Sequence, residues 1–305
     1  MAKIIVTGGA GFIGSNLVDE LIRQGHKDIH IIDNLSTGKK ENLNPKAKFH
    51  NLSIVDLDKI RPIFKKAEVV FHLAAQPRIQ PSIKDPKTSH DANLTGTLHV
   101  LLAAKEAGVK RFIYSASSSA YGLQKTMPLR EDMIANPLNP YAMQKYMGER
   151  YCQLFNHLYG LPVVCLRYFN VYGPRQTFEG AYATVVGIFL KQNKAGQPLT
   201  IVPDGKQRRD FTHVRDVVAA NLLAMKSNKI GKGEVINIGS GENHSIVEVA
   251  KMISSKAKVI APRKGEARLT LADISLAKKL LGWKPTVKLV DGIEELNKFD
   301  KKSSQ

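Results

Sequence analysis

Short apolar runs alternate with amphipathic segments through the first half of the chain. The apolar runs occupy residues 3–8, 28–33, 69–74, 111–116 and 162–169. They are rich in Val, Ile and Phe, which is typical of strands buried on both faces. Helical patterns lie between them around 12–24, 83–107 and 140–159, and the last ends at Gly160, two residues before Pro162. This alternation predicts an α/β fold with a doubly wound parallel sheet and helices on both of its faces.

The pattern changes after residue 169, where loops lengthen and the elements become shorter. A strand at 234–240, a helix from about 245 to 254, a late strand at AKVIAP and helices near 274–281 and 290–299 complete the chain. We see no internal repeat and no low-complexity linker. We therefore predict one principal domain, residues 1–169 plus about 212–240, and a smaller α/β lobe formed by about 170–211 and 241–305.

Composition narrows the class of protein. No apolar run reaches membrane-spanning length, and the N-terminus enters a strand pattern directly, so we expect a cytoplasmic protein with no membrane partner. The two cysteines have neither metal nor redox spacing, and none of the nine histidines forms an HxxxH pattern, so we expect no metal. The net charge of +18 suits anionic partners, but the lysines are dispersed, which favours a solvated surface over a nucleic-acid site.

The segment TGGAGFIGSN, residues 7–16, follows the first strand and opens the first helix. Gly8, Gly11 and Gly14 permit a tight turn and let a phosphate approach backbone N–H groups. Asp33 ends the second strand, 19 residues beyond Gly14, where a carboxylate can accept hydrogen bonds from ribose hydroxyls and repels a 2′-phosphate. Asp56, farther along, can meet an adenine amino group. The pattern predicts a dinucleotide site that prefers NAD to NADP.

The helix NPYAMQKYMGER, residues 139–150, carries a candidate acid/base pair. Tyr141 and Lys145 are four residues apart, so they share one face of the helix. Free tyrosine has a pKa of about 10 and is a poor base at neutral pH, but nearby cations favour its phenolate. Ser117 follows the strand RFIYSA at the carboxyl edge of the sheet, where open α/β folds bind ligands. These three residues are the predicted catalytic group.

With its GxxGxxG spacing and YAMQK motif, the chain resembles the short-chain dehydrogenase/reductase superfamily, in its extended branch of nucleotide-sugar epimerases and dehydratases. The resemblance runs through DNLSTG, FHLAAQ, YSASSSAYG, RYFNVYGPRQ, RRDFTHVRD and GEARLTLADIS. It implies a Rossmann domain that binds NAD, a lobe that binds a UDP-sugar, and a homodimer formed through a four-helix contact of helices 83–107 and 140–159. The implied NAD contacts are Gly8, Gly11, Phe12, Ile13, Gly14, Asp33, Asn34, Asp56, Leu57, Leu73, Ala74, Ala75, Asn93, Tyr141, Lys145 and Tyr168.

The residues after Ser117 indicate the type of reaction. The family's 4,6-dehydratases carry an Asp–Glu pair there, whereas this chain has Ser118 and Ser119. Without a carboxylic acid to protonate the leaving hydroxyl, dehydration lacks its general acid. The resemblance therefore implies a UDP-hexose 4-epimerase that acts through a 4-keto intermediate with tightly held NAD.

The resemblance also implies the substrate contacts, which are Ser117, Asn170, Arg209, Arg263, Glu266 and Thr270. Guanidinium groups suit the diphosphate, and Glu266 can accept ribose hydroxyls. In UDP-galactose 4-epimerases a bulky residue at the position of Thr270 narrows the pocket beside the sugar C2 substituent, whereas a small residue admits an N-acetyl group. Thr270 therefore favours use of both UDP-glucose/UDP-galactose and UDP-GlcNAc/UDP-GalNAc. On spacing alone, Thr270 is equally compatible with a place in the core of the lobe.

Two other functions stay open at this point. A UDP-glucuronate 4-epimerase or decarboxylase needs a cationic or hydroxyl-rich pocket for the C5 carboxylate, which one sequence does not place. A non-catalytic family member that binds nucleic acid has the charge of +18 as its support. Such a protein has no need for Ser117, Tyr141 and Lys145 together.

Overall fold

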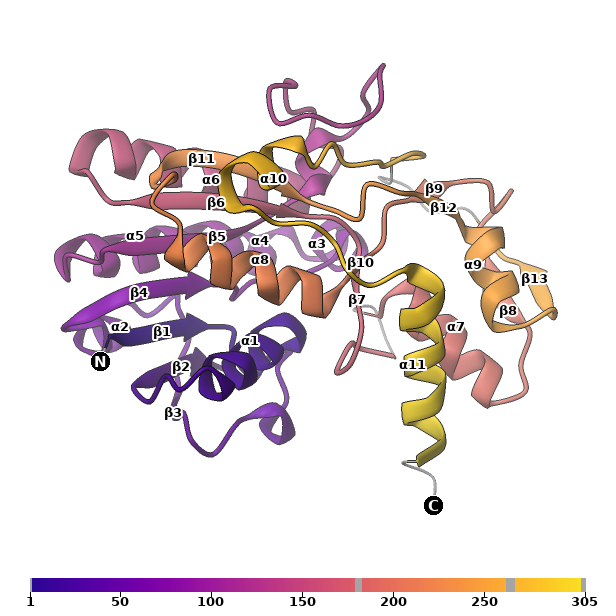
Figure 1. Cartoon of the computed structure of the whole chain (residues 1–305), viewed down its shortest axis with the longest axis horizontal. Helices are drawn as coiled ribbons and strands as arrows, with labels where there is room; N and C mark the ends of the chain where they lie inside the picture. The colour runs from indigo at the N-terminus through magenta and orange to yellow at the C-terminus, as the bar shows by residue number, and fades with distance from the viewer. Residues whose placement is uncertain (1, 179–182, 262–266, 303–305) are drawn as a thin grey trace.

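A parallel sheet of seven strands forms the centre of the computed structural model, which describes residues 2–178, 183–261 and 267–302. Its order is β11-β6-β5-β4-β1-β2-β3 (Figure 1). The strands are β1 (Lys3–Thr7), β2 (Ile29–Asp33), β3 (Lys48–Asn51), β4 (Ala67–His72), β5 (Arg111–Ser117), β6 (Val163–Tyr168) and β11 (Lys232–Ile238). The predicted α/β class with a parallel sheet is confirmed. The edge strand β3 was not predicted, because its sequence KFHN lacks a buried apolar run.

Alternating residues of each strand build two separate cores. Ile4 and Val6 of β1 join the core under α1 (Phe12–Arg23), α8 (Val214–Lys226) and α10 (Ser275–Leu281). Ile5, between them, joins the opposite core under α2 (Leu57–Phe64), α5 (Gly96–Glu106) and α6 (Pro140–Tyr159). Since both faces of the sheet are covered, the strands other than the edge strand β3 are largely apolar, which is why their sequence pattern is recognised.

Helix α6 begins and ends at the predicted residues. The Asn139 side chain accepts a hydrogen bond from the Ala142 N–H, Pro140 occupies the first helical position, and Gly160 closes the helix with φ +67°. The predicted helix at 83–107 is instead α3 (Ile79–Lys84) followed by one helical run from Pro86 to Glu106. That run comprises α4 (Pro86–His90), a π turn η2 (Asp91–Thr95) and α5. Helices α2 and α8 were not predicted.

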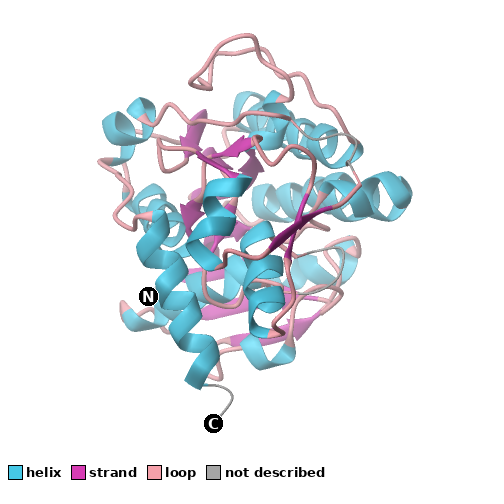
Figure 2. Ribbon diagram, turned by 90° about the vertical axis from the view of Figure 1, so that its right-hand side faces the viewer, coloured by secondary structure: helices cyan, strands magenta, loops and turns pink. Residues whose placement is uncertain are grey.

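Shorter elements gather beyond the carboxyl edge of the sheet, and Figure 2 views the molecule from their side. They include the strand pairs β7–β10, β9–β12 and β8–β13, and the apolar core between α7, α9 and α11. Their bounds are β7 (Val171–Tyr172), α7 (Val185–Lys194), β8 (Leu199–Ile201), β9 (Arg208–Arg209), β10 (Thr212–His213), β12 (His244–Ser245), α9 (Ile246–Ile253), β13 (Ala257–Val259) and α11 (Leu289–Lys302). Short 3-10 turns occur at η1 (Lys40–Asn42) and η3 (Ser118–Tyr121).

The segment around α10 differs from the predicted lobe boundary. Ala277 and Leu281 of α10, together with Trp283, pack in the core under the main sheet. The Trp283 indole N–H donates a hydrogen bond to the carbonyl of Asp216 in α8 at 2.9 Å. The apolar side of α10 is therefore buried against the principal domain, and not in the lobe to which residues 241–305 were assigned.

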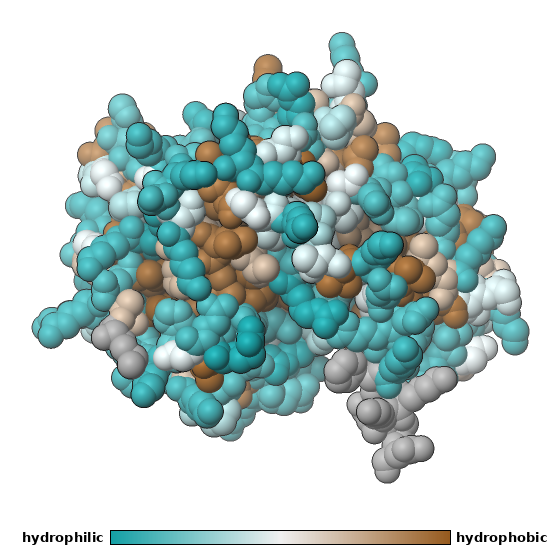
Figure 3. Space-filling view, in the orientation of Figure 1, coloured by the Kyte–Doolittle hydropathy of each residue, from teal (hydrophilic) through white to brown (hydrophobic). Residues whose placement is uncertain are grey.

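One face of the molecule is predominantly polar. Figure 3 shows hydrophilic side chains over most of one face, interrupted by smaller apolar areas. Within the described ranges, no helix combines the length and the apolar composition needed to cross a membrane.

Candidate functional site

A cavity of about 800 Å³ lies at the carboxyl ends of the strands and extends toward α7 and α9. Most of the predicted site residues line it. They are Gly8, Gly11, Phe12, Ile13, Gly14, Asp33, Asn34, Leu73, Ala74, Ala75, Ser117, Tyr141, Lys145, Tyr168, Asn170, Arg209 and Thr270. The structure thus brings the glycine turn, the acid/base pair and the lobe residues together around one space.

The glycine turn fits the phosphate groups of a dinucleotide. Gly8 has φ +74°, and a Cβ there would lie 2.7 Å from the backbone nitrogen of Ala74. A Cβ at Gly14 would overlap the carbonyl oxygen of Gly8. The turn therefore packs tightly between β4 and the first turn of α1, and the N–H groups at this helix end can bind an anion.

Asp33 lies at the end of β2 and is nearly buried. Its two carboxylate oxygens accept hydrogen bonds from the Ala10 N–H at 3.0 Å and the Leu35 N–H at 2.8 Å. Burial raises the pKa of Asp33, and these two N–H groups oppose the change. The carboxylate thus fixes the glycine turn and keeps lone pairs directed toward the cavity for a ribose hydroxyl.

Three predicted cofactor contacts are not among the residues that line the cavity, and their contact with NAD stays a prediction. Asp56 and Leu57 begin α2, outside the residues that line the cavity. The Asp56 carboxylate caps α2 through the Lys59 N–H and pairs with the Lys59 ammonium at 2.6 Å. A carboxylate at a helix N-terminus is commonly engaged by that helix, and the lone pairs that remain leave the predicted adenine contact of Asp56 untested.

Asn93 is buried in the π turn behind the cavity. Its carboxamide accepts a hydrogen bond from the Gln76 N–H at 2.7 Å and donates one to the Gln76 carbonyl at 3.1 Å. Asn93 therefore holds the loop after β4 in place instead of lining the cavity.

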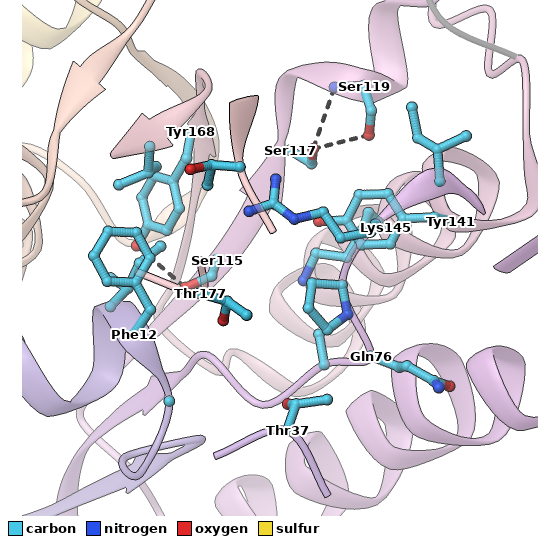
Figure 4. A pocket seen from close by; sticks show the side chains of 18 of the residues that line it. Phe12, Thr37, Gln76, Ser115, Ser117, Ser119, Tyr141, Lys145, Tyr168 and Thr177 are labelled. Atoms are coloured by element: carbon cyan, nitrogen blue, oxygen red, sulfur yellow. Dashed lines mark hydrogen bonds between the residues drawn. The ribbon is translucent and has the colours of Figure 1, made fainter. Parts of the chain in front are cut away.

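The predicted catalytic residues face the same part of the cavity. Figure 4 shows Tyr141 and Lys145 on one side of the pocket and Phe12 and Tyr168 on the other. The Ser117 hydroxyl lines the cavity together with Tyr141 and lowers the pKa of the phenol as a hydrogen-bond partner. It also lies 2.8 Å from the Ser119 hydroxyl. The arrangement supplies a phenol, an ammonium and a hydroxyl at one place, which suits proton transfer to and from an alcohol.

Burial changes the proton affinity of both members of the pair. It raises the pKa of Tyr141, while the hydrogen bond from Ser117 and the charge of Arg78 oppose the change. Burial lowers the pKa of Lys145 to about 8. The Lys145 ammonium lies 4.4 Å from the centroid of the Tyr114 ring, so a cation–π contact holds its charge at the bottom of the cavity.

The lobe side of the cavity is built around Thr270. Its hydroxyl accepts hydrogen bonds from the Asp210 N–H at 3.2 Å and from the Asn170 carboxamide at 3.4 Å. Asn170 also donates to the Asp210 carbonyl at 2.8 Å. Thr270 is thus both a cavity-lining residue and part of the lobe framework. Arg209 lines the cavity nearby, whereas Arg263 and Glu266 lie outside the described residues.

Sequence reasoning missed other residues that line the cavity, notably Arg78 and Thr177. Arg78 lies in the loop after β4, at the carboxyl edge of the sheet. Its position six residues after the end of the buried strand β4 could have identified it as a candidate ligand-binding residue, because open α/β sheets bind ligands at this edge.

His72 does not line the cavity and makes structural contacts. It is fully buried between the hydroxyls of Thr7 and Thr97, at 2.7 and 2.9 Å, and burial lowers its pKa to about 3. In the part of the chain that the structure describes, no group of three His, Cys, Asp or Glu side chains could hold a metal ion.

Comparison with known proteins relates this architecture to enzymes of one family. The model of the "NAD dependent epimerase/dehydratase family" matches residues 4–239. The solved UDP-glucose 4-epimerase of Thermotoga maritima with UDP-glucose is 40% identical, with a TM-score of 0.94 and coverage of 99% of this chain and 100% of that one.

Two further solved structures match this chain, and each match covers 99% of this chain and 99% of the solved chain. The UDP-N-acetylglucosamine 4-epimerase of Methanobrevibacter ruminantium, in complex with UDP-N-acetylmuramic acid, is 36% identical with a TM-score of 0.93. The UDP-glucuronic acid 4-epimerase of Bacillus cereus, with UDP-glucuronic acid and NAD, is 36% identical with a TM-score of 0.90.

Proposed function

The chain belongs to the NAD-dependent epimerase/dehydratase family and is a UDP-sugar 4-epimerase that uses NAD, and we propose that it interconverts UDP-glucose with UDP-galactose and UDP-GlcNAc with UDP-GalNAc. The observation that carries the proposal is the convergence of Ser117, Tyr141 and Lys145 on the cavity that begins at the glycine turn. Serines follow Ser117 in η3, which suits reversible oxidation at C4 without loss of water.

The residues present fit the cofactor. The glycine turn and the start of α1 suit the pyrophosphate, Asp33 suits the adenosine ribose, and Lys145 suits the ribose of the nicotinamide half. NAD supplies a reversible hydride acceptor, so the reaction has no net oxidation.

The side chains of the protein move the proton. Tyr141 as phenolate accepts the proton of the C4 hydroxyl while C4 is oxidised, and Ser117 bridges the phenol and the sugar oxygen. The 4-keto sugar then turns within the cavity, so that C4 is reduced on its opposite face while Tyr141 returns the proton to the C4 oxygen. Turning requires weak sugar contacts and firm contacts to UDP, and the Arg209 guanidinium suits the diphosphate.

Use of N-acetyl sugars rests on Thr270. This residue lines the cavity with a side chain of modest size, and its hydroxyl is held by Asp210 and Asn170. Space beside a sugar substituent admits an acetamido group and still accepts the smaller hydroxyl, because an unfilled volume discriminates weakly.

UDP-glucuronate is the second candidate substrate. The lining includes the Arg78 guanidinium and the hydroxyls of Ser119 and Thr177, groups that can bind a C5 carboxylate. A UDP-glucuronic acid 4-epimerase is also among the similar structures described above.

We also propose a homodimer formed through α5 and α6. The outer side of α6 exposes Met143, Met147, Leu154 and Leu158, whose spacing places them along one stripe. An exposed apolar stripe on a long helix is typical of a protein interface. A Leu154→Arg variant should elute as a monomer in size-exclusion chromatography with light scattering, and an unchanged mass would contradict this interface.

The decisive assay incubates the purified protein separately with UDP-glucose, UDP-galactose, UDP-GlcNAc, UDP-GalNAc and UDP-glucuronate, without added NAD. We expect interconversion within both neutral pairs, and conversion of UDP-glucuronate alone would reject the proposed substrates. Tyr141→Phe should abolish turnover while UDP binding, measured by calorimetry, is retained. Normal turnover of this variant would show that another group is the base.

A further inference from the structure

Arg78 occupies an unusual backbone position beside the reaction centre. It precedes α3 with φ +86° and ψ +146°, a conformation that residues with a side chain rarely adopt. The surrounding chain holds it there. Asn93 fixes the backbone of Gln76 through two hydrogen bonds, and the Ser82 hydroxyl of α3 accepts the Tyr141 N–H at 3.1 Å. Such strain persists only where neighbouring contacts impose it, and it is common at functional sites.

The Arg78 guanidinium and the Tyr141 phenol are electrostatic partners. Both side chains line the cavity. The charge of Arg78 lowers the pKa of Tyr141, against the larger effect of burial. Conversely, Tyr141 raises the pKa of Arg78, which burial lowers. In a partly dehydrated cavity such coupling is weakly screened by solvent.

The other charged groups around Tyr141 are committed to different contacts. Lys145, one turn along α6, lies over the Tyr114 ring. Glu149, a further turn along, is paired with Arg167 at 2.7 Å. From β5, the buried Tyr114 phenol has its pKa raised, mainly by burial, and Tyr141 is a minor contributor. Arg78 thus lines the same cavity as Tyr141 but comes from a separate element, the β4–α3 loop.

We propose that Arg78 is a positioning residue for the base, whose guanidinium stabilises the Tyr141 phenolate alongside Lys145. The inference rests on the proposed function, in which Tyr141 takes the C4 hydroxyl proton. It adds a cation that the sequence motifs did not identify. The strained backbone then has a role, since it places a long cationic side chain from a loop at the cavity that Tyr141 also lines.

The test compares Arg78→Gln, Arg78→Lys and the control Arg130→Gln, all with bound NAD. Arg130 is an exposed arginine paired with Asp132, so its variant removes one positive charge away from the cavity. The rate of UDP-glucose conversion is measured at saturating substrate across pH. In Arg78→Gln the rate at each pH below 8 should fall roughly tenfold, because a Tyr141 pKa about one unit higher leaves about one tenth of the phenolate. Arg78→Lys should lose less, and Arg130→Gln should match the parent protein.

A second readout does not need turnover. The ultraviolet absorbance of tyrosinate is titrated in the parent protein and in Tyr141→Phe, and the difference isolates Tyr141. The same pair is then made in the Arg78→Gln background, where ionisation of Tyr141 should occur at higher pH. This result would support the proposal even if no UDP-sugar tested were a substrate, so failure of the proposed function remains distinguishable.

Three results would overturn the proposal. An unchanged rate below pH 8 together with unchanged Tyr141 ionisation would remove the electrostatic role. A loss of rate with unchanged Tyr141 ionisation, not restored in Arg78→Lys, would assign Arg78 a purely structural role. A loss confined to UDP-glucuronate, with the profile for neutral sugars intact, would make Arg78 a carboxylate-binding residue instead.

Discussion

Replacing Glu149 by Gln should destabilise the protein strongly, although the two side chains have nearly the same size and shape. Glu149 accepts two hydrogen bonds from Arg167, at 2.9 and 2.7 Å, and the two side chains are 2% and 3% exposed. The guanidinium also lies over the Tyr121 ring, 4.4 Å from its centroid. A neutral carboxamide in place of the carboxylate would leave a buried arginine without its counter-ion. Breaking one side of such a pair costs about 3–5 kcal/mol, against a total of about 5–15 kcal/mol for a typical domain.

Denaturant unfolding measures this loss through Trp283, the single tryptophan, which is buried in the main core. The matched control is Glu20→Gln, which breaks the exposed two-bond pair with Arg23 and should leave the unfolding midpoint almost unchanged. The double variant Glu149→Leu with Arg167→Met should be more stable than Glu149→Gln, because it removes both buried charges. The reasoning fails if Glu149→Gln costs less than about 1 kcal/mol, or if the double variant is the less stable one.

Three further predictions concern the site. The rate of epimerisation should fall as pH rises through about 8, because burial lowers the pKa of Lys145 to about 8 and the ammonium then loses its proton. A rate profile that stays flat to pH 10 would contradict this. Thr270→Tyr should selectively reduce turnover of N-acetyl substrates, and equal losses on both sugar types would reject a role of Thr270 in substrate selectivity. Thr270→Val should keep the selectivity. It should lose about 1–3 kcal/mol of stability, because the buried Asp210 N–H is left unpaired. Gly14→Ala should lower the NAD content of the purified protein, since its Cβ would overlap the Gly8 carbonyl oxygen and force the glycine turn apart; full NAD occupancy would refute the packing argument.

Local signals were sufficient where an element carries its own boundaries. Asn139 and Gly160 define α6 because a cap and a left-handed terminus are properties of neighbouring residues. Helix α2 has 8 residues, contains Pro62 and was not predicted, so Asp56 was interpreted without the helix that it caps. The structure shows that Asp56 caps that helix and pairs with Lys59.

The sequence by itself determined the alternation of strands and helices that predicts a parallel sheet, the glycine turn, and the one-turn spacing of Tyr141 and Lys145. Each of these is a pattern of residues that are close in sequence. The tertiary structure decided what surrounds them. It brought Arg78 and Tyr141 to one cavity, joined Thr270 to Asp210 and Asn170 by hydrogen bonds, and packed α10 against the main core. Those contacts join residues far apart in the chain, and their charges and hydrogen bonds act through space. Local pattern therefore specified the reacting groups, and long-range packing set the electrostatic environment in which they work.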